Sequence, residues 1–308
     1  MFAQKKGLGL AVVALAVTAT LAGCSSSNPL DTGDGDEGGT TAITIGSQGF
    51  AENEILAQVY GQVLAANGYE VTYNTSIGER EAFLTGLGDG SIDLIPEYAG
   101  NLLYGSDPDA TASSVEDVTA ALPAVLEPLD LTTLDFAPGA DADAFVVTRE
   151  FSEENNVTSI GDLAPIANTL TLAANTPFEG RWFGKLAETY GVEGLTFKAI
   201  DDFGGPGTLK ELLDNSVQIA DIYTTTPSIK ANDLVVLEDP ESLIPVQNVV
   251  PLLSKSVYSD ELAELLNAVS AKITTDVLID LNTTYGGDDK PSAAVVAEAW
   301  LKDNGFLK

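Results

Sequence analysis

Two tyrosines end the same sequence pattern at two distant places in the chain. The segment DGSIDLIPEY ends at Tyr98 and DNSVQIADIY ends at Tyr223, with aspartate, serine and tyrosine in the same columns. The face of a tyrosine ring attracts a cation by about 0.5 to 2 kcal/mol. Two such rings facing each other would suit a cation that has no hydrogen-bond donors. Taken singly, each tyrosine is more typical of a half-buried ring whose hydroxyl finds a partner.

A second chemistry that the residue types allow is acid-base catalysis by paired carboxylates. Asp93 and Glu97 lie on the same side of an extended segment, and glycosidases use pairs of this kind. Pro96 interrupts that segment, and the sequence contains no second catalytic signature. A secreted carboxylate-dependent hydrolase therefore stays an alternative, and an adhesion or sensor lipoprotein is a third.

The composition removes several classes of site. The chain of 308 residues contains no histidine and a single cysteine. A histidine-based catalytic triad, a zinc site with the usual ligands and a disulfide framework are therefore excluded. We expect no cofactor and no metal.

The order of predicted elements favours an α/β domain with mainly parallel sheets. Strands and helices alternate over 42–46, 51–68, 70–76, 79–87 and 91–95, and a helix at 114–129 follows. After a strand at 143–148, a second set occupies 169–175, 181–191, 195–200, 207–215 and 217–223. The tail is predicted to form helices at 259–273 and 291–305, which Ser259 and Pro291 would start.

A unit of helix, strand and tyrosine occurs once in each set, with Leu84 and Leu209 at equivalent positions. Two amphipathic segments can match in this way by chance, whereas a true repeat predicts two similar lobes. In open α/β sheets, ligands bind outside the carboxyl ends of the strands. Tyr98 and Tyr223 would then each project from its own lobe into a shared cleft.

The N-terminal segment has the features of a targeting signal. Lys5 and Lys6 precede the apolar run LGLAVVALAVTATLA, which is short for a membrane span and ends at LAGC. The motif LAGC, at residues 21–24, resembles the lipobox of bacterial lipoproteins, in which the cysteine is lipidated. We expect a signal peptide at 1–23, lipidation at Cys24 and a flexible tether over 24–41.

The charge balance is strongly acidic, with 46 acidic and 14 basic residues and a net charge of −32. Loss of Lys5 and Lys6 with the leader makes the mature chain more negative still. Such a surface repels nucleic acid and anionic lipids, although acidity also serves solubility and does not identify a ligand. The acidic run DTGDGDEGG lacks the spacing of a calcium loop and is more typical of a solvated tether.

Four segments together resemble a known family. IGSQGFAENEILAQVYGQVL, GSIDLIPEYAGN, FEGRWFGKLAETYG and QIADIYTTTPSIKANDLVVLEDP are similar to the substrate-binding proteins of glycine betaine, choline and carnitine ABC importers, which bind quaternary ammonium compounds. The resemblance covers most of the chain from Ile43 to about Pro251, and more loosely the tail. It implies a two-lobed, periplasmic-binding-protein-like fold of type II with a ligand cleft between the lobes.

The resemblance also implies where the chain crosses between the lobes. The two hinge crossings would lie near Pro138 to Asp143 and near Pro245 to Pro251. Lobe 1 would then comprise 42–140 and 250–308, and lobe 2 would comprise 141–249.

The same resemblance implies the ligand-binding residues. Tyr98 and Tyr223 match aromatic residues that surround the ligand's quaternary ammonium group, and Phe145 lies where the family commonly has tyrosine. Arg181, in FEGR, matches an arginine that binds the ligand's carboxylate, for which a planar guanidinium is well suited.

Three further site positions depart from the family pattern. Gln48 replaces a lysine, Asn101 replaces a threonine, and Gln247 replaces a tyrosine that closes the aromatic box. The departures leave three possibilities open: weaker betaine binding, a ligand with a different polar end, and a choline-like ligand without a carboxylate.

The function implied by the family is solute capture rather than catalysis. The chain would be a monomer that is lipid-anchored on the extracytoplasmic face of a bacterial membrane. It would bind a quaternary ammonium solute by closing its hinge and deliver it to permease subunits of an ABC importer. Nucleic acid is not an expected partner.

Overall fold

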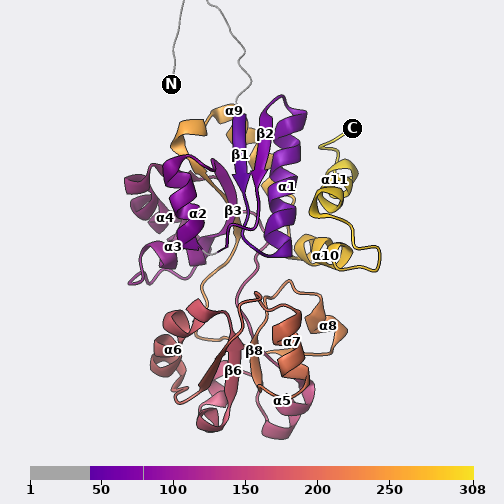
Figure 1. The fold of residues 1–308 in the computed structure, drawn as a ribbon. Helices are drawn as coiled ribbons and strands as arrows, with labels where there is room; N and C mark the ends of the chain where they lie inside the picture. Colours follow the sequence, from indigo (N-terminus) through magenta and orange to yellow (C-terminus); the bar gives the residue numbers. More distant parts are fainter. Residues whose placement is uncertain (1–41, 79) are drawn as a thin grey trace, which may run out of the picture. The chain divides into compact units, whose positions relative to one another are not determined.

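The computed structural model describes residues 42–78 and 80–308. The expected signal peptide, Cys24, the tether and the acidic run before Ala42 lie outside the described residues. The described chain forms two five-stranded sheets, each with helices on both faces (Figure 1). This confirms the predicted two-lobed α/β fold. Among these residues, no helix is long and apolar enough to cross a membrane.

The first sheet has the strand order β2-β1-β3-β10-β4. Its strands are β1 (Ala42–Gly46), β2 (Glu70–Asn74), β3 (Leu94–Tyr98), β4 (Leu131–Thr133) and β10 (Val249–Ser254). β1 pairs in parallel with β2 and β3, whereas β10 runs antiparallel to both β3 and β4. The register places Val249 opposite Tyr98, so β10 begins beside the carboxyl end of β3.

The second sheet repeats this arrangement in the order β7-β6-β8-β5-β9. Its strands are β5 (Phe145–Val147), β6 (Thr171–Ala174), β7 (Thr196–Ala199), β8 (Ile219–Asp221) and β9 (Val235–Val236). β6 pairs in parallel with β7 and β8, and β5 runs antiparallel to β8 and β9. The matched sequence segments therefore occupy equivalent strands: Tyr98 ends β3, and Tyr223 follows β8.

β10 in the first sheet and β5 in the second are the antiparallel strands, and each is the first strand that the chain forms after it crosses from the other sheet. The chain passes from β4 to β5 and returns from β9 to β10. Since β10 and β5 run antiparallel to their neighbours, both sheets are mixed, whereas the sequence pattern suggested mainly parallel sheets. We propose that the hinge crossings lie in these two connections, close to the expected lobe boundaries, although Val249 already pairs within the first sheet.

Helices cover both faces of the first sheet. One face is packed by α1 (Ala51–Ala66), α9 (Asp260–Ser270), α10 (Thr275–Tyr285) and α11 (Ala293–Asp303). The opposite face is packed by α2 (Arg80–Asp89), α3 (Ala99–Ser106) and α4 (Val115–Leu126). α1 turns its apolar stripe, which includes Ile55, Val59 and Val63, into the first of these cores.

The second sheet also has a core on each face. Residues of α6 (Thr176–Tyr190) pack in one core, and residues of α7 (Pro206–Leu213) and α8 (Ser228–Ala231) in the other. α5 (Arg149–Asn155) follows β5. Short 3₁₀ segments occupy Glu127–Leu129, Ile160–Leu163, Ala167–Thr169 and Lys255–Val257.

The helix starts in the C-terminal tail differ at one position from the sequence prediction. Ser259 caps α9 as expected, since its hydroxyl accepts a hydrogen bond from the Leu262 N–H. α11, however, is capped by Ser292 and not started by Pro291, because the Ser292 hydroxyl accepts from the Val295 N–H.

The capping geometry at α11 generates a stability prediction. Ser292→Ala removes the acceptor for the Val295 N–H and should lower the free energy of unfolding by about 1 kcal/mol. Pro291→Ala, one residue earlier and outside the helix, is the matched control and should change it by less than about 0.5 kcal/mol. Urea denaturation of both variants would measure the difference. A larger loss in the proline variant would contradict the assigned cap.

Candidate functional site

A cavity of about 290 Å³ is lined by residues of both lobes. Most of the lining residues follow the carboxyl ends of β1, β3, β6, β7 and β8, where ligands bind in open α/β sheets. The cavity is lined by Gln48, Phe50, Arg80, Glu81, Leu84, Tyr98, Asn101, Gly105, Asp141, Asp143, Asn175, Pro177, Arg181, Phe203 and Tyr223.

The structure brings five of the seven expected ligand-binding residues to this cavity. Gln48, Tyr98, Asn101, Arg181 and Tyr223 line it. The other two expected residues, Phe145 and Gln247, are not among its lining residues.

The side chain of Phe145 lies in the core of the second lobe. Phe145 is 2% exposed, and its ring packs edge-on against Phe178 at a centroid distance of 5.6 Å. Its position along β5, opposite Asp221, is near the cavity. Strand alternation nevertheless directs the ring to the sheet face that α6 covers.

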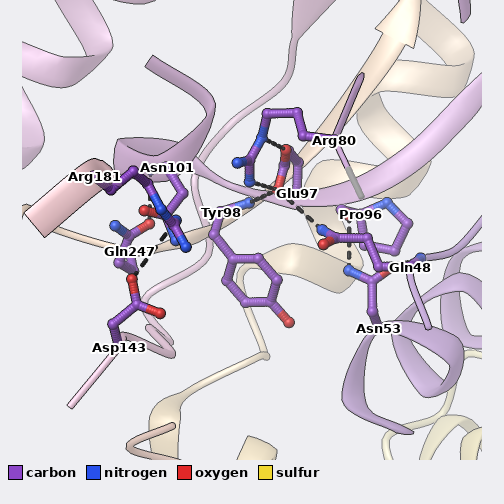
Figure 2. Close-up of polar contacts among 10 residues, drawn as sticks. All are labelled: Gln48, Asn53, Arg80, Pro96, Glu97, Tyr98, Asn101, Asp143, Arg181 and Gln247. Atoms are coloured by element: carbon purple, nitrogen blue, oxygen red, sulfur yellow. Dashed lines mark hydrogen bonds and ion pairs between the residues drawn. The ribbon is translucent and has the colours of Figure 1, made fainter. Parts of the chain in front are cut away.

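Gln247 supports the lining instead of forming it. Its side chain is buried, and its Oε1 accepts a hydrogen bond of 2.9 Å from the Asn101 N–H at the start of α3 (Figure 2). Its contribution is therefore to hold the backbone of Asn101, whose side chain reaches the cavity.

Four aromatic rings form a cluster at the cavity. The Phe50 ring contacts three others: Tyr98 at a centroid distance of 5.9 Å, Phe203 at 5.5 Å and Tyr223 at 5.7 Å. Phe50 and Tyr98 belong to the first lobe, and Phe203 and Tyr223 belong to the second. The aromatic lining is thus assembled from both lobes with Phe50 at its centre.

Sequence reasoning missed Phe50 and Phe203, although a signal for both was present. Each follows the carboxyl end of a strand that lies parallel to its neighbours, Phe50 after β1 and Phe203 after β7. The strand-end rule that pointed to the two tyrosines applies equally to these positions.

Phe203, whose ring lines the cavity, has a strained backbone conformation. Phe203 has a φ of +57°, a region that bulky residues rarely adopt. Asn175 stabilises this conformation, since its Oδ1 accepts a 2.9 Å hydrogen bond from the Phe203 N–H. The next residue must be small, because a Cβ on Gly204 would lie 2.9 Å from the carbonyl oxygen of Asp221.

Arg80, which the sequence analysis did not single out, is held by a buried acid. Its Nε and Nη2 donate to the two carboxylate oxygens of Glu97 at 2.6 and 3.0 Å (Figure 2). The same carboxylate accepts from the Tyr98 N–H at 2.9 Å and from Gln48 Nε2 at 3.2 Å. Glu97 therefore fixes Gln48, Arg80 and the backbone of Tyr98 together.

Arg181 is also paired with an acid of the protein. Its Nη1 lies 3.7 Å from Oδ2 of Asp143, whose side chain is 2% exposed. Trp182 Nε1 donates to the same oxygen at 3.1 Å. The neighbouring Asp221 is buried, and its pKa is raised well above the usual range, first by burial and then by the charge of Asp143.

The residue that ties the two lobes together beside the cavity is Glu52 of α1. Its Oε1 accepts from the Tyr98 hydroxyl at 2.8 Å. Its Oε2 accepts from the Thr225 hydroxyl of the second lobe at 2.6 Å and from Asn282 Nδ2 of α10 at 2.7 Å. One carboxylate thereby joins a cavity tyrosine, the second lobe and the C-terminal helices.

Asp141, in the crossing from β4 to β5, completes this polar junction. Its Oδ1 accepts from the Thr225 N–H at 3.1 Å and from the Thr224 hydroxyl at 3.2 Å. Burial, followed by the charge of Glu52, raises the pKa of Asp141 well above its usual range. Burial raises the pKa of Glu52 as well, and the hydrogen bonds from Thr225, Tyr98 and Asn282 partly offset that effect. Folding therefore favours protonation of this pair of buried carboxyls.

Both expected tyrosines remain neutral phenols. Burial is the largest cause that raises their pKa values well above the usual range, followed by the charge of Glu52 for Tyr98 and of Asp143 for Tyr223. The alternative acid pair does not form a comparable site. Asp93 Oδ2 accepts from the Thr44 N–H and Glu97 is bound to Arg80, and neither acid lines the cavity.

Comparison with known proteins agrees with this geometry. Residues 41–303 match the OpuAC family, the substrate binding domain of ABC-type glycine betaine transport systems. The chain belongs to this family.

Individual relatives are distant but align over most of their length. The chain is 25% identical over 280 residues to the glycine betaine-binding protein YehZ of Escherichia coli, covering 86% of this chain and 92% of that one. It is 24% identical over 275 residues to the carnitine transport binding protein OpuCC of Listeria monocytogenes, covering 86% and 88%. The crystal structure of a glycine betaine/carnitine/choline ABC transporter protein superposes with a TM-score of 0.70 at 22% identity, covering 88% and 100%. At that identity the superposition shows a shared fold.

For this OpuAC-family protein, the junction of Glu52 and Asp141 predicts a pH dependence of stability. The pKa of Asp141 is raised above its ordinary value of 3.8 by folding. Its contribution to stability is therefore complete below that value and is lost as the pH rises toward the folded-state pKa. Asp141→Asn fixes a neutral group of nearly the same shape at this position. We expect this variant to lose less free energy of unfolding than the wild type between about pH 4 and pH 8.

Urea denaturation across that pH range would check the expectation. Asp303→Asn, at the exposed end of α11, is the matched control for removing one acid and should follow the wild type. Parallel pH profiles of the Asp141 variant and the wild type would show that folding does not raise the pKa of Asp141.

Proposed function

We propose that this protein captures a quaternary ammonium solute outside the cytoplasmic membrane and delivers it to the permease of an ABC importer. The observation that carries the proposal is the cluster of Phe50, Tyr98, Phe203 and Tyr223, which lines one cavity from both lobes. Membership in the OpuAC family supports the same role.

The lining suits a cation that cannot donate hydrogen bonds. A quaternary ammonium group is held by ring faces at about 0.5 to 2 kcal/mol per ring, and it loses little hydration on entering such a site. A cavity of about 290 Å³ matches a small solute. The strongly negative net charge of −32 attracts cations at longer range.

Capture of the solute requires only that the two lobes close around it. A solute that touches rings of both lobes stabilises the closed form by its differential affinity for that form, and the permease would recognise it. No covalent step is needed, and we propose that the protein is a monomeric binding component and not an enzyme. The hydrolase and adhesion alternatives lack comparable support.

Binding of simple quaternary ammonium compounds tests the proposal. Choline, glycine betaine or carnitine should raise the melting temperature of the folded domain, and the compound with the largest shift is used for calorimetry. Tyr223→Ala should then weaken binding about tenfold, because one ring face is lost. Tyr223→Phe keeps the ring and should stay within about threefold of the wild type.

Two controls make this result decisive. Tyr258→Ala, at an exposed tyrosine outside the cavity, should leave the affinity unchanged. Melting curves show that the variants are folded. The proposed function is wrong if none of the three compounds shifts the melting temperature, and the ring assignment is wrong if the alanine and phenylalanine variants bind equally.

We further propose that Cys24 anchors the protein to the extracytoplasmic face of the membrane through a lipid, with 1–23 as its signal peptide. LAGC after an apolar run supports this assignment. Cys24→Ala should release the protein from the membrane fraction, while Ser25→Ala should not. Fractionation after a high-salt wash is the measurement, because salt removes weak charge contacts but not an acyl anchor. Retention of the cysteine variant on the membrane would refute the anchor.

A further inference from the structure

Both arginines that line the described cavity already face buried carboxylates of the protein. Arg80 is held by Glu97, which is fully buried, and Arg181 lies beside Asp143, whose side chain is 2% exposed. A solute carboxylate that approached Arg181 would meet the negative charge of Asp143 at the same place. The arginine that the family resemblance assigns to a carboxylate is therefore already neutralised.

Asp143 is fixed in this position by its surroundings. Trp182 Nε1 donates to the oxygen that faces Arg181, and Trp182 itself is 1% exposed. The adjacent Asp221 accepts from the Ala144 N–H at 3.1 Å. Asp143 is the acid whose side-chain oxygen faces Arg181, at 3.7 Å. The pair of Asp143 and Arg181 is thus built into the second lobe.

Nε2 of the buried Gln247, which does not line the cavity, has no hydrogen-bond partner among the described residues. Two side-chain atoms of residues that do line the cavity also have none. They are Oδ1 of Asn101 and Nε of Arg181, both buried in residues that line the cavity. Figure 2 draws Asn101, Arg181, Asp143 and Gln247 on one side of the Tyr98 ring, with the pair of Arg80 and Glu97 above the ring in this view. One of the two unpartnered atoms accepts a hydrogen bond and the other donates one.

This combination selects the chemistry of the solute's polar end. A hydroxyl both donates and accepts, so one hydroxyl can satisfy Asn101 Oδ1 and Arg181 Nε together. A carboxylate only accepts, and it would leave Asn101 Oδ1 unpaired while adding a negative charge next to Asp143. Leaving a buried polar group unpaired disfavours the complex.

We infer that the solute is a quaternary ammonium alcohol with a net positive charge, and that Asp143 excludes carboxylate-bearing analogues by neutralising Arg181. The solute hydroxyl donates to Asn101 Oδ1 and accepts from Arg181 Nε. This inference rests on the proposed function, because it requires the aromatic rings to hold the trimethylammonium group.

Three ligands that share the trimethylammonium group separate the contributions. Choline carries a hydroxyl, ethyltrimethylammonium replaces that hydroxyl by hydrogen, and glycine betaine carries a carboxylate. Calorimetry at one pH and ionic strength should show choline binding at least about tenfold more tightly than either of the others. These measurements use the unmodified sequence and need no variant to fold.

Variants then assign the effect to residues. Asp143→Asn keeps an oxygen for Trp182 but frees the charge of Arg181, so the preference for choline over glycine betaine should fall at least about tenfold. Asp303→Asn removes an exposed acid at the end of α11, outside the cavity, and is the matched control for net charge, so it should change that preference by less than about twofold. Asn101→Ala should remove most of the advantage of choline over ethyltrimethylammonium.

The outcomes distinguish this inference from the proposed function. Equal or tighter binding of glycine betaine than of choline to the wild type would overturn only the inference. Equal binding of choline and ethyltrimethylammonium would overturn the hydroxyl contacts. An equal loss of preference in the Asp303 and Asp143 variants would show a general charge effect and overturn the role of Asp143. If none of the three ligands binds, the proposed function fails and the inference fails with it.

Discussion

The buried carboxylate of Glu52 is the contact on which the arrangement of the site depends. Removing such a group from water costs several kcal/mol, and only close hydrogen-bond donors offset that loss. Its donors come from β3, from the loop after β8 and from α10. The ring of Tyr98 is therefore positioned by the same group that holds Thr225 of the second lobe. Asp141 adds the crossing segment to this junction through its contacts with Thr224 and Thr225, and burial, followed by the charge of Glu52, raises its pKa well above the usual range.

The charged side chains at the cavity are likewise paired within the protein. Glu97 and Asp143 neutralise the two lining arginines, so neither guanidinium is a free positive charge beside the aromatic rings. This matters because a free arginine would repel the cation that the rings attract. Under the proposed function, the aromatic faces of Phe50, Tyr98 and Tyr223 would hold the cation, and the polar atoms of Asn101 and Arg181 would orient the bound molecule.

The sequence predicted the lobes and the strand-end tyrosines because both follow from periodicity. Alternating strands and helices, and a repeated segment that ends in tyrosine, are local patterns that the topology preserves. The mixed sheets were not predicted, because β5 and β10 enter their sheets from the opposite lobe and nothing local marks that crossing. The α10 helix was also not predicted.

Side-chain direction was the second limit of sequence reasoning. Phe145 occupies the expected position along β5, but the face to which its ring points depends on register, and the ring packs on Phe178. Glu52 and Asp141 were missed for a related reason. An acid in the first turn of a helix, or in a crossing segment, usually stays in solvent, and only tertiary contacts reveal that these two are buried.

Contacts between the lobes determine how much binding free energy a solute must supply to stabilise the closed form. Phe50 packs on Phe203, Tyr104 packs on Trp182 at 6.3 Å, and Glu52 accepts from Thr225. Each favours the closed form by an amount of the order of 1 kcal/mol, as aromatic pairs and hydrogen bonds do. A closed form that is already well populated raises the apparent affinity for the solute, but a closed form that is too stable would prevent release. If the lobes separated, the carboxylate of Glu52 would regain hydration, which would offset the loss of the bond from Thr225. The aromatic contacts would have no such compensation, so under the proposed function the rings that would bind the solute are also the groups that would most resist opening.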